Sequence, residues 1–212
     1  MNEKFFDLKK EKQDRMINAA LKVFALHGYR HACTDDIVKE AAISKGLLFH
    51  YFGSKLGVYA FVYDYSVRYL LLELSTAVDA KETDLFTLMQ QVETGKMHAM
   101  CGYPYLQPFL NRAQAENVNE ALVAVEERKQ QMEEAYENIY ARADLGKYAA
   151  AEDVMKLRKM MELTIKGLMN ERILEDAFQP EMLYEEITEY LNLSRRLAER
   201  STQPSDEAFS EK

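Results

Sequence analysis

Residues 34–55, TDDIVKEAAISKGLLFHYFGSK, contain two short helical patterns that are joined by almost no linker. The first pattern has two Asp residues in its first turn, where the helix dipole favours negative charge. The second begins after Ser44, a preferred N-cap residue, and ends at Gly53. Leu48 and Phe52 lie four residues apart on this second helix and share the face that is expected to be packed. Two short helices so closely joined predict a helix-turn-helix.

A third helix precedes this pair and completes a small helical head. Residues 11–28 carry apolar residues at helical spacing and end at Gly28, a good helix stop. Thr34 stands at the expected N-cap of the next helix, which runs to residue 41 or 42. Ser54 is expected to open a fourth, long helix that is apolar on most sides.

The helix that follows Ser44 has the composition of a surface that approaches DNA. Ser44 and the free backbone N–H groups at the helix start can meet a phosphate, and Gly46 allows close approach. The basic and aromatic side chains that follow can reach phosphates, base edges or thymine methyl groups. Each could instead be an ordinary exposed residue, and Tyr51 could belong to the three-helix core. The candidates are Ser44, Lys45, Gly46, Phe49, His50, Tyr51 and Lys55.

Residues 17–62, INAALKVFALHGYRHACTDDIVKEAAISKGLLFHYFGSKLGVYAFV, resemble the tetracycline-repressor (TetR) family of bacterial transcriptional regulators. The shared elements are an Ala-rich first helix that ends in Phe-x-x-x-Gly, the Thr ahead of Ile-Val, and Ile-Ser-Lys-Gly at the turn. Phe-His-Tyr-Phe and Ser-Lys-Leu also match. The resemblance covers only the head of the chain.

By this resemblance, DNA-contacting positions of the family fall on Thr34, Ser44, Lys45, Gly46, Phe49, His50, Tyr51 and Lys55. Two positions depart from the pattern. Leu47 is apolar where many relatives have a polar residue, and Phe49 often appears as Tyr. The resemblance also implies a dimer interface of four helices built from the last two helices of each chain.

The composition predicts an all-α protein. The chain has 212 residues with only 8 Gly and 4 Pro, and its long runs rich in Ala, Leu, Glu and Met lack strand-like alternation. We expect a head at residues 1–56 and a larger helical body for effector binding and dimerisation at residues 57–200. Residues 201–212 are polar, without periodicity, and are predicted to be disordered.

The body is expected to contain several long helices. The patterns span residues 54–78, 117–142, 152–175 and 181–199, with Pro180 at the start of the last. Gly102 and Pro104 mark a break between two further helices.

The charge is distributed unevenly along the chain. The net charge is −8, yet residues 1–56 hold ten Lys and Arg against seven Asp and Glu, and three of the four His. A mildly basic head on an acidic body suits a DNA-binding protein with a separate second domain, although so small an excess also arises by chance.

The chain carries no signal for a membrane or a secretory route. MNEKFFDLKKEKQDR is too charged for a signal peptide, and no apolar run approaches the roughly 18–20 residues that cross a bilayer. Cys33 and Cys101 are far apart and are expected to be reduced thiols. We expect a cytoplasmic protein, associated with the nucleoid when it is bound to DNA.

An effector pocket is predicted around the break at residues 102–108. Met adapts to irregular shapes and Tyr combines an apolar ring with a polar end, so a set of both suits a pocket between helices. His98 and Arg112 are candidate polar anchors among few buried charges. This predicts a mostly apolar ligand with one polar or anionic end, although the same residues could simply fill the core. The candidates are Met97, His98, Met100, Tyr103, Tyr105, Arg112, Met132 and Tyr136.

The last two helices have the pattern of a dimer surface. Residues 152–175 carry two apolar stripes, and a helix with two apolar faces needs two partners. One stripe can face its own domain and the other a second copy of the chain, with Gly167 allowing close helix approach. The candidate interface residues are Met160, Leu163, Gly167, Leu174, Tyr190 and Leu197.

The sequence holds no recognisable catalytic, metal or cofactor motif. His98 and Cys101 lie three residues apart, but a second half of such a site is not visible. We therefore predict a non-enzymatic, sequence-specific DNA-binding regulator, a repressor that a small molecule releases from operator DNA. The alternative is a helical protein-interaction adaptor, or a small-molecule-binding protein without a role on DNA, which leaves the DNA-type head unexplained.

Overall fold

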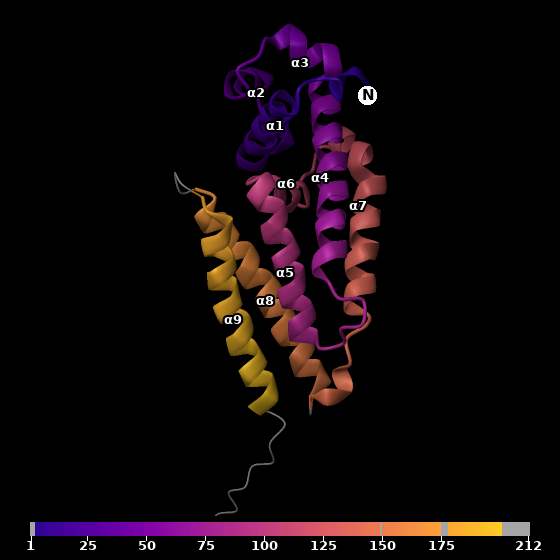
Figure 1. Cartoon of the computed structure of the whole chain (residues 1–212), viewed down its shortest axis with the longest axis vertical. Coiled ribbons are helices and arrows are strands. Elements are labelled where there is room, and N and C mark those ends of the chain that lie inside the picture. Colours follow the sequence, from indigo (N-terminus) through magenta and orange to yellow (C-terminus); the bar gives the residue numbers. More distant parts are fainter. Residues whose placement is uncertain (1–2, 149, 175–177, 201–212) are drawn as a thin grey trace, which may run out of the picture.

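The computed structural model describes residues 3–148, 150–174 and 178–200, and over these ranges the chain is helical with no strand (Figure 1). This confirms the predicted all-α fold. The predicted disorder of residues 201–212 and the predicted last residue of the 152–175 helix lie outside the described residues. The helices are α1 (Lys10–His31), α2 (Thr34–Glu40), α3 (Lys45–Phe52), α4 (Lys55–Ala77), α5 (Leu85–Gly102), α6 (Leu106–Ala113), α7 (Asn119–Tyr140), α8 (Ala151–Arg172) and α9 (Pro180–Arg200), with short 3-10 turns η1 (Glu3–Phe5) and η2 (Leu145–Lys147).

The helices form a small head on a long helical body. Figure 1 shows α1, α2 and α3 at one end, with α4 running from this head down the body beside α7. Helices α8 and α9 flank the opposite side, and α5 lies between the two pairs. Helix α6 lies at the junction, below α1. Within the described part of the chain, no helix is both long enough and apolar enough to span a bilayer.

Local signals in the sequence set three helix ends in the head. The Ser44 hydroxyl accepts a hydrogen bond from the backbone N–H of Leu47 at 3.2 Å, and Ser54 caps α4 in the same way. Gly53 ends α3 with a φ of 74°, a conformation that favours glycine. The predicted capping role of Thr34 is wrong by one residue. The N-cap of α2 is Cys33, which has extended backbone angles and makes no side-chain cap, so Thr34 is already helical.

Gly28 interrupts α1 where the sequence predicts a stop. Its φ of 68° and ψ of 173° are non-helical, and the chain then continues in a helical turn to His31. A Cβ added to Gly28 would lie 3.2 Å from Nε of Arg112, so a side chain here would crowd the body as well as strain the backbone. Gly28 therefore lets the end of α1 lie close to the C-terminal turn of α6.

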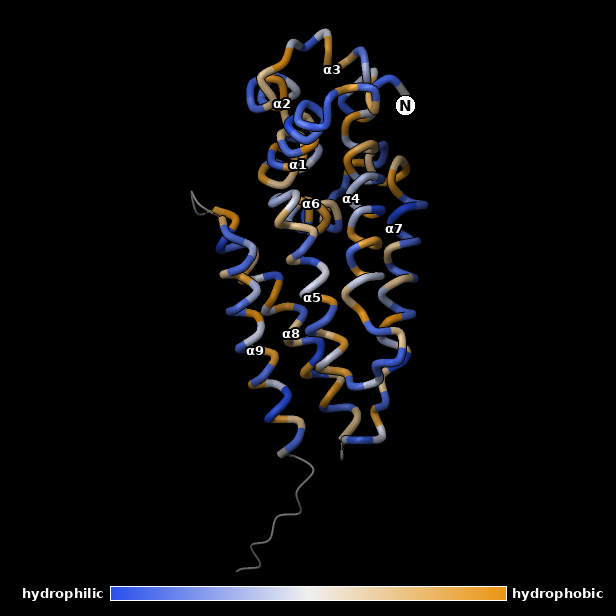
Figure 2. Tube along the Cα trace, viewed as in Figure 1, coloured by the Kyte–Doolittle hydropathy of each residue, from blue (hydrophilic) through white to orange (hydrophobic). Residues whose placement is uncertain are grey.

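Two hydrophobic clusters hold the described residues together. The first joins the head to α4, α5, α6 and α7, and at its centre the ring of Phe109 packs 6.1 Å from Phe24 and 5.5 Å from Tyr59. This cluster contains residues on both sides of the predicted boundary at residue 56, so head and body share one core. The second cluster joins the start of α5 to α8 and α9. Figure 2 shows the matching pattern of hydrophobic and hydrophilic residues along the helices.

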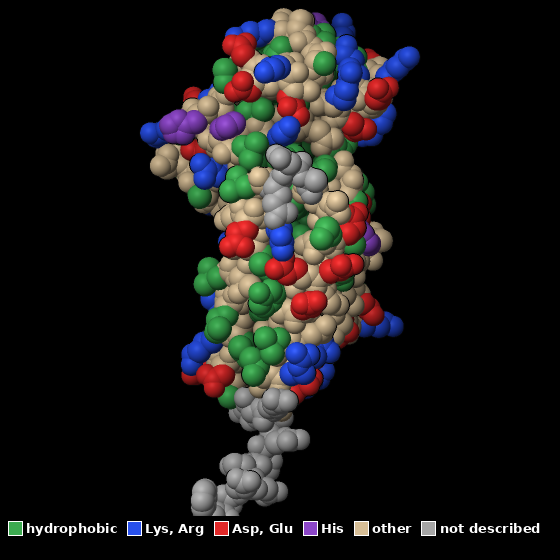
Figure 3. All heavy atoms as spheres, turned by 90° about the vertical axis from the view of Figure 1, so that its left-hand side faces the viewer, with side chains coloured by type: hydrophobic (Ala, Val, Ile, Leu, Met, Phe, Trp, Pro, Cys, Tyr) green, Lys and Arg blue, Asp and Glu red, His purple; other side chains and the backbone are tan. Residues whose placement is uncertain are grey.

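Helix α8 has the two apolar faces that the sequence predicts. Val154, Met161 and Ile165 are buried, whereas Met160 and Leu163 are 61% and 59% exposed. Helix α9 is divided in the same way, because Leu183 and Ile187 are buried and its outward residues are not. Figure 3 shows exposed hydrophobic side chains along the lower body on the side of α9. The other large exposed apolar residues of the two helices are Met155, Leu174, Met182, Tyr190, Leu193 and Leu197.

Asp84 ties three parts of the body together. Its carboxylate caps α5 by accepting hydrogen bonds from the backbone N–H and hydroxyl of Thr87, at 2.9 and 2.8 Å. It also accepts one from Arg195 of α9 at 2.6 Å and one from the Tyr148 hydroxyl at 3.2 Å. Partial burial raises the pKa of Asp84, but the Thr87 hydrogen bonds and the Arg195 charge outweigh this, and the pKa is lowered from 3.8.

We expect Asp84→Ala to lower the free energy of unfolding by about 2 kcal/mol, because an N-cap and a charged hydrogen bond are lost together. Since the folded-state pKa is lowered, the carboxylate contributes its stability above pH 3.8 and loses it as the pH falls further. Urea titrations from neutral to acidic pH measure both effects. Glu133→Ala is the control, because this exposed carboxylate lies 4.0 Å from Lys129 and should change stability by less than about 0.5 kcal/mol. Equal effects of the two variants would contradict the role of Asp84.

Candidate nucleic-acid interface and body cavity

The start of α3 is open on the outer end of the head. Ser44, Lys45 and Gly46 are exposed, and a Cβ added to Gly46 would have no neighbour within 4 Å. Packing within this chain therefore does not require glycine at position 46. Nζ of Lys45 pairs with Oδ1 of Asp35 at 2.8 Å, so this exposed ammonium is held beside the first turn of α2.

The aromatic residues of α3 do not share one face. At 3.6 residues per turn, His50 lies on the same side as Gly46 and is exposed. Tyr51 leans toward the packed side, where its ring lies 5.7 Å from Phe5. Phe49 and Leu47 are half-buried beside the exposed strip. Gly46 and His50 therefore form the outward strip, and Tyr51 is partly engaged by the N-terminal segment.

Lys55 and Thr34 border the same end of the head. Nζ of Lys55 donates to the backbone carbonyl of Arg30 at 3.3 Å and lies 4.8 Å from the centre of the Tyr29 ring. Its ammonium group thus joins the start of α4 to the end of α1. Thr34 is half-buried as the first residue of α2.

A backbone feature of the helix-turn-helix was not predicted from sequence. Ala42, in the turn between α2 and α3, has a φ of 50°, in the left-handed region that a side chain disfavours. Ile43 follows with a backbone hydrogen bond to the Val38 carbonyl at 3.1 Å. This turn sets the angle between the two helices without a glycine.

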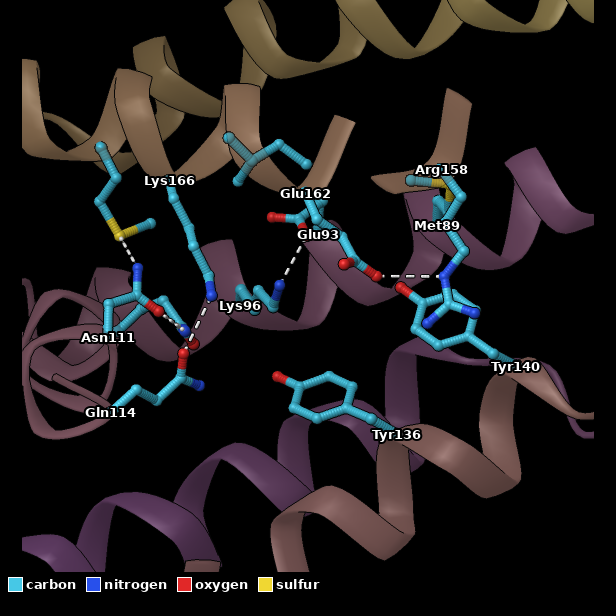
Figure 4. Close-up of a pocket in the computed structure, with 13 residues that line it drawn as sticks. Met89, Glu93, Lys96, Asn111, Gln114, Tyr136, Tyr140, Arg158, Glu162 and Lys166 are labelled. Atoms are coloured by element: carbon cyan, nitrogen blue, oxygen red, sulfur yellow. Dashed lines mark hydrogen bonds and ion pairs between the residues drawn. The ribbon is translucent and has the colours of Figure 1, made fainter. Parts of the chain in front are cut away.

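The body contains a cavity of about 210 Å³ between α5, α6, α7 and α8 (Figure 4). It lies where the short α6 and its C-terminal end meet three long helices. Its lining is Met89, Glu93, Lys96, Gln107, Asn111, Gln114, Tyr136, Tyr140, Arg158, Glu162, Ile165, Lys166 and Met169.

Ion pairs line one side of this cavity. Nζ of Lys96 lies 2.7 Å from Oε1 of Glu93, and the two side chains are only 16% and 5% exposed. Burial lowers the pKa of Lys96, but the neighbouring Glu93 carboxylate outweighs it and the pKa is raised. Nε of Arg158 donates to Glu162 at 3.1 Å while the guanidinium lies 4.0 Å from the centre of the Tyr140 ring.

Two buried polar atoms at the cavity have no hydrogen-bond partner among the described residues. They are the hydroxyl oxygen of Tyr136 and Oε1 of Gln107, whose side-chain nitrogen donates to Asn111 at 2.9 Å. Burying a polar group without a partner costs free energy, so both atoms are available to a ligand.

The predicted effector residues are not gathered at one site. Only Tyr136 of the eight lines this cavity. Met100 and Met132 are buried in the two cores, and Arg112 and Tyr105 border hollows near the head. His98 is exposed with Nδ1 4.0 Å from Glu73, and Met97 contacts Cys101.

Tyr103 lies at the junction of head and body. Its hydroxyl donates to Asp14 of α1 at 2.6 Å, accepts from Lys10 at 3.0 Å and lies 2.6 Å from the Tyr65 hydroxyl. The helix break at residues 102–105 therefore packs against the head, and Pro104 and Tyr105 border a hollow beside α1.

The buried pair of Glu93 and Lys96 at the cavity was not predicted from sequence. The missed lining residues carried one usable signal. Glu93 and Lys96 are three residues apart on α5, and Arg158 and Glu162 are four residues apart on α8. No group of His, Cys, Asp and Glu that could hold a metal ion is found among the described residues.

Comparison with known proteins agrees with this geometry. Residues 16–60 match the family model described as bacterial regulatory proteins, tetR family. An uncharacterized HTH-type transcriptional regulator, YuxN of Bacillus subtilis (strain 168), is 37% identical over 78 residues. That match covers 35% of this chain and 26% of YuxN, so it spans about a quarter of that relative.

The fold of most of the chain is similar to solved structures of TetR-family regulators. A putative tetR family transcription regulator from Shewanella sp. PV-4 aligns with a TM-score of 0.56 at 14% identity, over 91% of this chain and 98% of the other. A TetR family transcriptional regulator from Chloroflexus aurantiacus J-10-FL aligns with a TM-score of 0.56 at 22% identity, over 94% and 93%. The all-helical fold and the closely joined helices α2 and α3 of the head define a helix-turn-helix protein. Residues 16–60, which include this helix pair, match the TetR family, and the chain is similar in fold to structures of that family.

Proposed function

We propose that this chain is a sequence-specific DNA-binding transcriptional regulator that acts as a homodimer and responds to a small molecule in the body cavity. The exposed start of α3 would enter the major groove, with Ser44 and Lys45 at the phosphates and Gly46 and His50 facing the bases. A repressor that leaves its operator when the ligand binds is the mode we favour.

The observation that carries this proposal is the position of α6, which is shared by the cavity and the head. Gln107 and Asn111 line the cavity, whereas Phe109 on the same eight-residue helix packs against Phe24 of α1. A ligand that shifts α6 would thus displace α1 as well. Such a ligand alters DNA affinity only by its differential affinity for the two arrangements.

A second connection joins the end of α6 to the head. The backbone N–H of Tyr29 donates to Glu116 at 2.9 Å, and the Tyr29 hydroxyl donates to Glu120 at the start of α7. Lys55, which begins α4 just after α3, lies against the same Tyr29 ring. A movement at the α6–α7 connection would therefore be transmitted through Tyr29 and Lys55 to the end of the head that carries α3.

The proposed dimer uses the outward faces of α8 and α9. Their exposed apolar residues lie on neighbouring helices on one side of the body, opposite α7 (Figure 3). Gly167 lies within this surface, and a Cβ there would have no neighbour within 4 Å. In a dimer the two copies of α3 would enter successive major grooves, about 34–36 Å apart.

We expect Lys45→Ala to weaken DNA binding and to reduce the dependence of the binding constant on salt. Each lost phosphate contact should lower the slope of log K against log salt by about one, hence by about two per dimer. Fluorescence anisotropy on a bound DNA fragment at several salt concentrations gives the slope. Lys81→Ala, at an exposed lysine between α4 and α5 at the far end of the body from the head, is the matched control and should leave the slope unchanged. An unaltered slope for Lys45→Ala would remove Lys45 from the interface.

A further inference from the structure

We propose that the body cavity binds a small monoanion that combines a carboxylate, a hydrogen-bond donor and an apolar body, as in a hydroxy-substituted carboxylic acid. The link from this ligand to transcription rests on the function proposed above, but its binding to the cavity does not. The lining charges, the two unpartnered atoms and the apolar wall each restrict the ligand.

The charges that line the cavity leave one cation without a carboxylate partner. Lys96 pairs with Glu93 and Arg158 pairs with Glu162. Lys166 instead donates to the neutral side chain of Gln114 at 3.0 Å. Three cations thus line the cavity against two carboxylates, and because Lys166 is exposed its ammonium can turn to a ligand with a single negative charge.

The excess positive charge lies beside an unpartnered hydroxyl. Figure 4 shows the ammonium groups of Lys96 and Lys166 and the hydroxyl of Tyr136 directed toward the same open space. A carboxylate in that space would accept hydrogen bonds from all three groups. Charged hydrogen bonds of this kind are stronger than neutral ones, and a carboxylate has enough lone pairs for three donors.

The second unpartnered atom, Oε1 of Gln107, can accept a hydrogen bond from a donor on the ligand. Gln107 is 6% exposed, and its Oε1 is an acceptor with no partner among the described residues. A hydroxyl or N–H group on the ligand would satisfy it. Because Gln107 belongs to α6, this contact would place the ligand directly on the helix that packs against the head.

The remaining wall is apolar and the space is small. Met89, Ile165 and Met169 line it together with the Tyr rings, which suits a short hydrocarbon chain or one aromatic ring. The volume of about 210 Å³ lies below the usual range for drug-sized ligands. Glu93 and Glu162 would repel a phosphate dianion, and the three cations would repel an amine. The sequence predicts a mostly apolar ligand with one polar or anionic end, and the proposed ligand keeps the anionic end and adds a hydrogen-bond donor.

Calorimetric titration with four probes tests the ligand class. The probes are 4-hydroxybenzoate and 3-hydroxyhexanoate as hydroxy acids, 4-hydroxybenzamide as the neutral analogue and 4-hydroxybenzylamine as the cation. At least one hydroxy acid should bind at millimolar concentration or below, and the amide and the amine should bind at least about tenfold more weakly. Binding of neither acid, or tighter binding of the amide or the amine, would overturn the proposal.

Variants of the full-length protein test the site. Lys166→Gln and Tyr136→Phe should each weaken binding of the hydroxy acid about tenfold or more, because each removes a donor to the carboxylate. Tyr136→Phe should not lower the melting temperature of the free protein, since the lost hydroxyl has no partner to leave behind. Lys156→Gln, also on α8 but outside the lining, is the matched control. Unchanged affinity of both site variants for the hydroxy acid would mean that the acid binds outside this cavity.

Gel shifts distinguish failure of this inference from failure of the proposed function. DNA binding by the parent protein without any probe tests the regulator alone. If a hydroxy acid binds to the protein but does not change the gel shift, the cavity is a ligand site without a regulatory role. If the protein binds the hydroxy acid but no DNA, the proposed ligand class stands and the proposed function as a regulator fails.

Discussion

Gly167→Arg is expected to convert the dimer into a folded monomer. In the single chain a side chain at this position meets open space, so the substitution should not disturb the fold of the protomer. In the proposed dimer it would place a guanidinium from each subunit between apolar helix faces without a carboxylate partner. Burying an unpaired charge costs several kcal/mol, on the order of 3–5 kcal/mol when a partner is lacking.

Sedimentation velocity at several protein concentrations measures this change, and circular dichroism checks that the helices remain. Val123→Arg is the matched control, because Val123 is a 69% exposed apolar residue on α7, away from α8 and α9. It should leave the dimer intact. A Gly167→Arg protein that dimerises as tightly as the parent would place the interface elsewhere.

Glu93→Gln should lower the free energy of unfolding by about 3 kcal/mol, because it leaves the buried ammonium of Lys96 without its carboxylate. The pKa of Lys96 is raised above its ordinary value of 10.5 by Glu93. The ion pair therefore stabilises the folded state fully below pH 10.5, and this contribution is lost as the pH rises further. Chemical denaturation at neutral pH gives the change.

A double variant separates the ion pair from simple packing. Glu93→Leu combined with Lys96→Met replaces the pair with apolar side chains of similar length, which is often neutral or stabilising. The double variant should thus recover most of the stability that Glu93→Gln loses. A loss under about 1 kcal/mol for Glu93→Gln would mean that Lys96 is hydrated in the folded protein.

The head could be predicted from sequence because its signals are local. Ser44, Gly53 and Ser54 act through hydrogen bonds and backbone angles within four residues, and the structure confirms each. Thr34 fails by one residue because the chain takes extended angles at Cys33 and is helical from Thr34 onward. The strained Ala42 could not be foreseen, since alanine gives no sign of a positive φ.

The cavity could not be predicted, because it is assembled from four helices that are distant in the sequence. Met and Tyr content marked the region of the break at residues 102–108, but the Tyr103 hydroxyl is hydrogen-bonded to Asp14 and Lys10 of the head. The spacing of Glu93 and Lys96 carried the better signal. Charge pairs on a buried helix face indicate a polar cavity more directly than adaptable apolar side chains do.

The two faces of α8 were predictable because both follow from helical periodicity. The sequence separates Met161 and Ile165 from Met160 and Leu163, and burial follows the same division. Periodicity shows that the second face needs a partner. The identity of that partner as a second copy comes from the family resemblance and remains a prediction.

A footprint on the DNA that flanks the gene for this protein tests the central proposal most directly. Purified protein should retard this DNA in the presence of excess nonspecific competitor. Hydroxyl-radical cleavage should then show two protected patches with centres about 34–36 Å apart, one for each copy of α3. Lys45→Ala should weaken both patches together. Retardation that the competitor abolishes, or protection of one isolated patch, would contradict a dimeric regulator that reads DNA with α3.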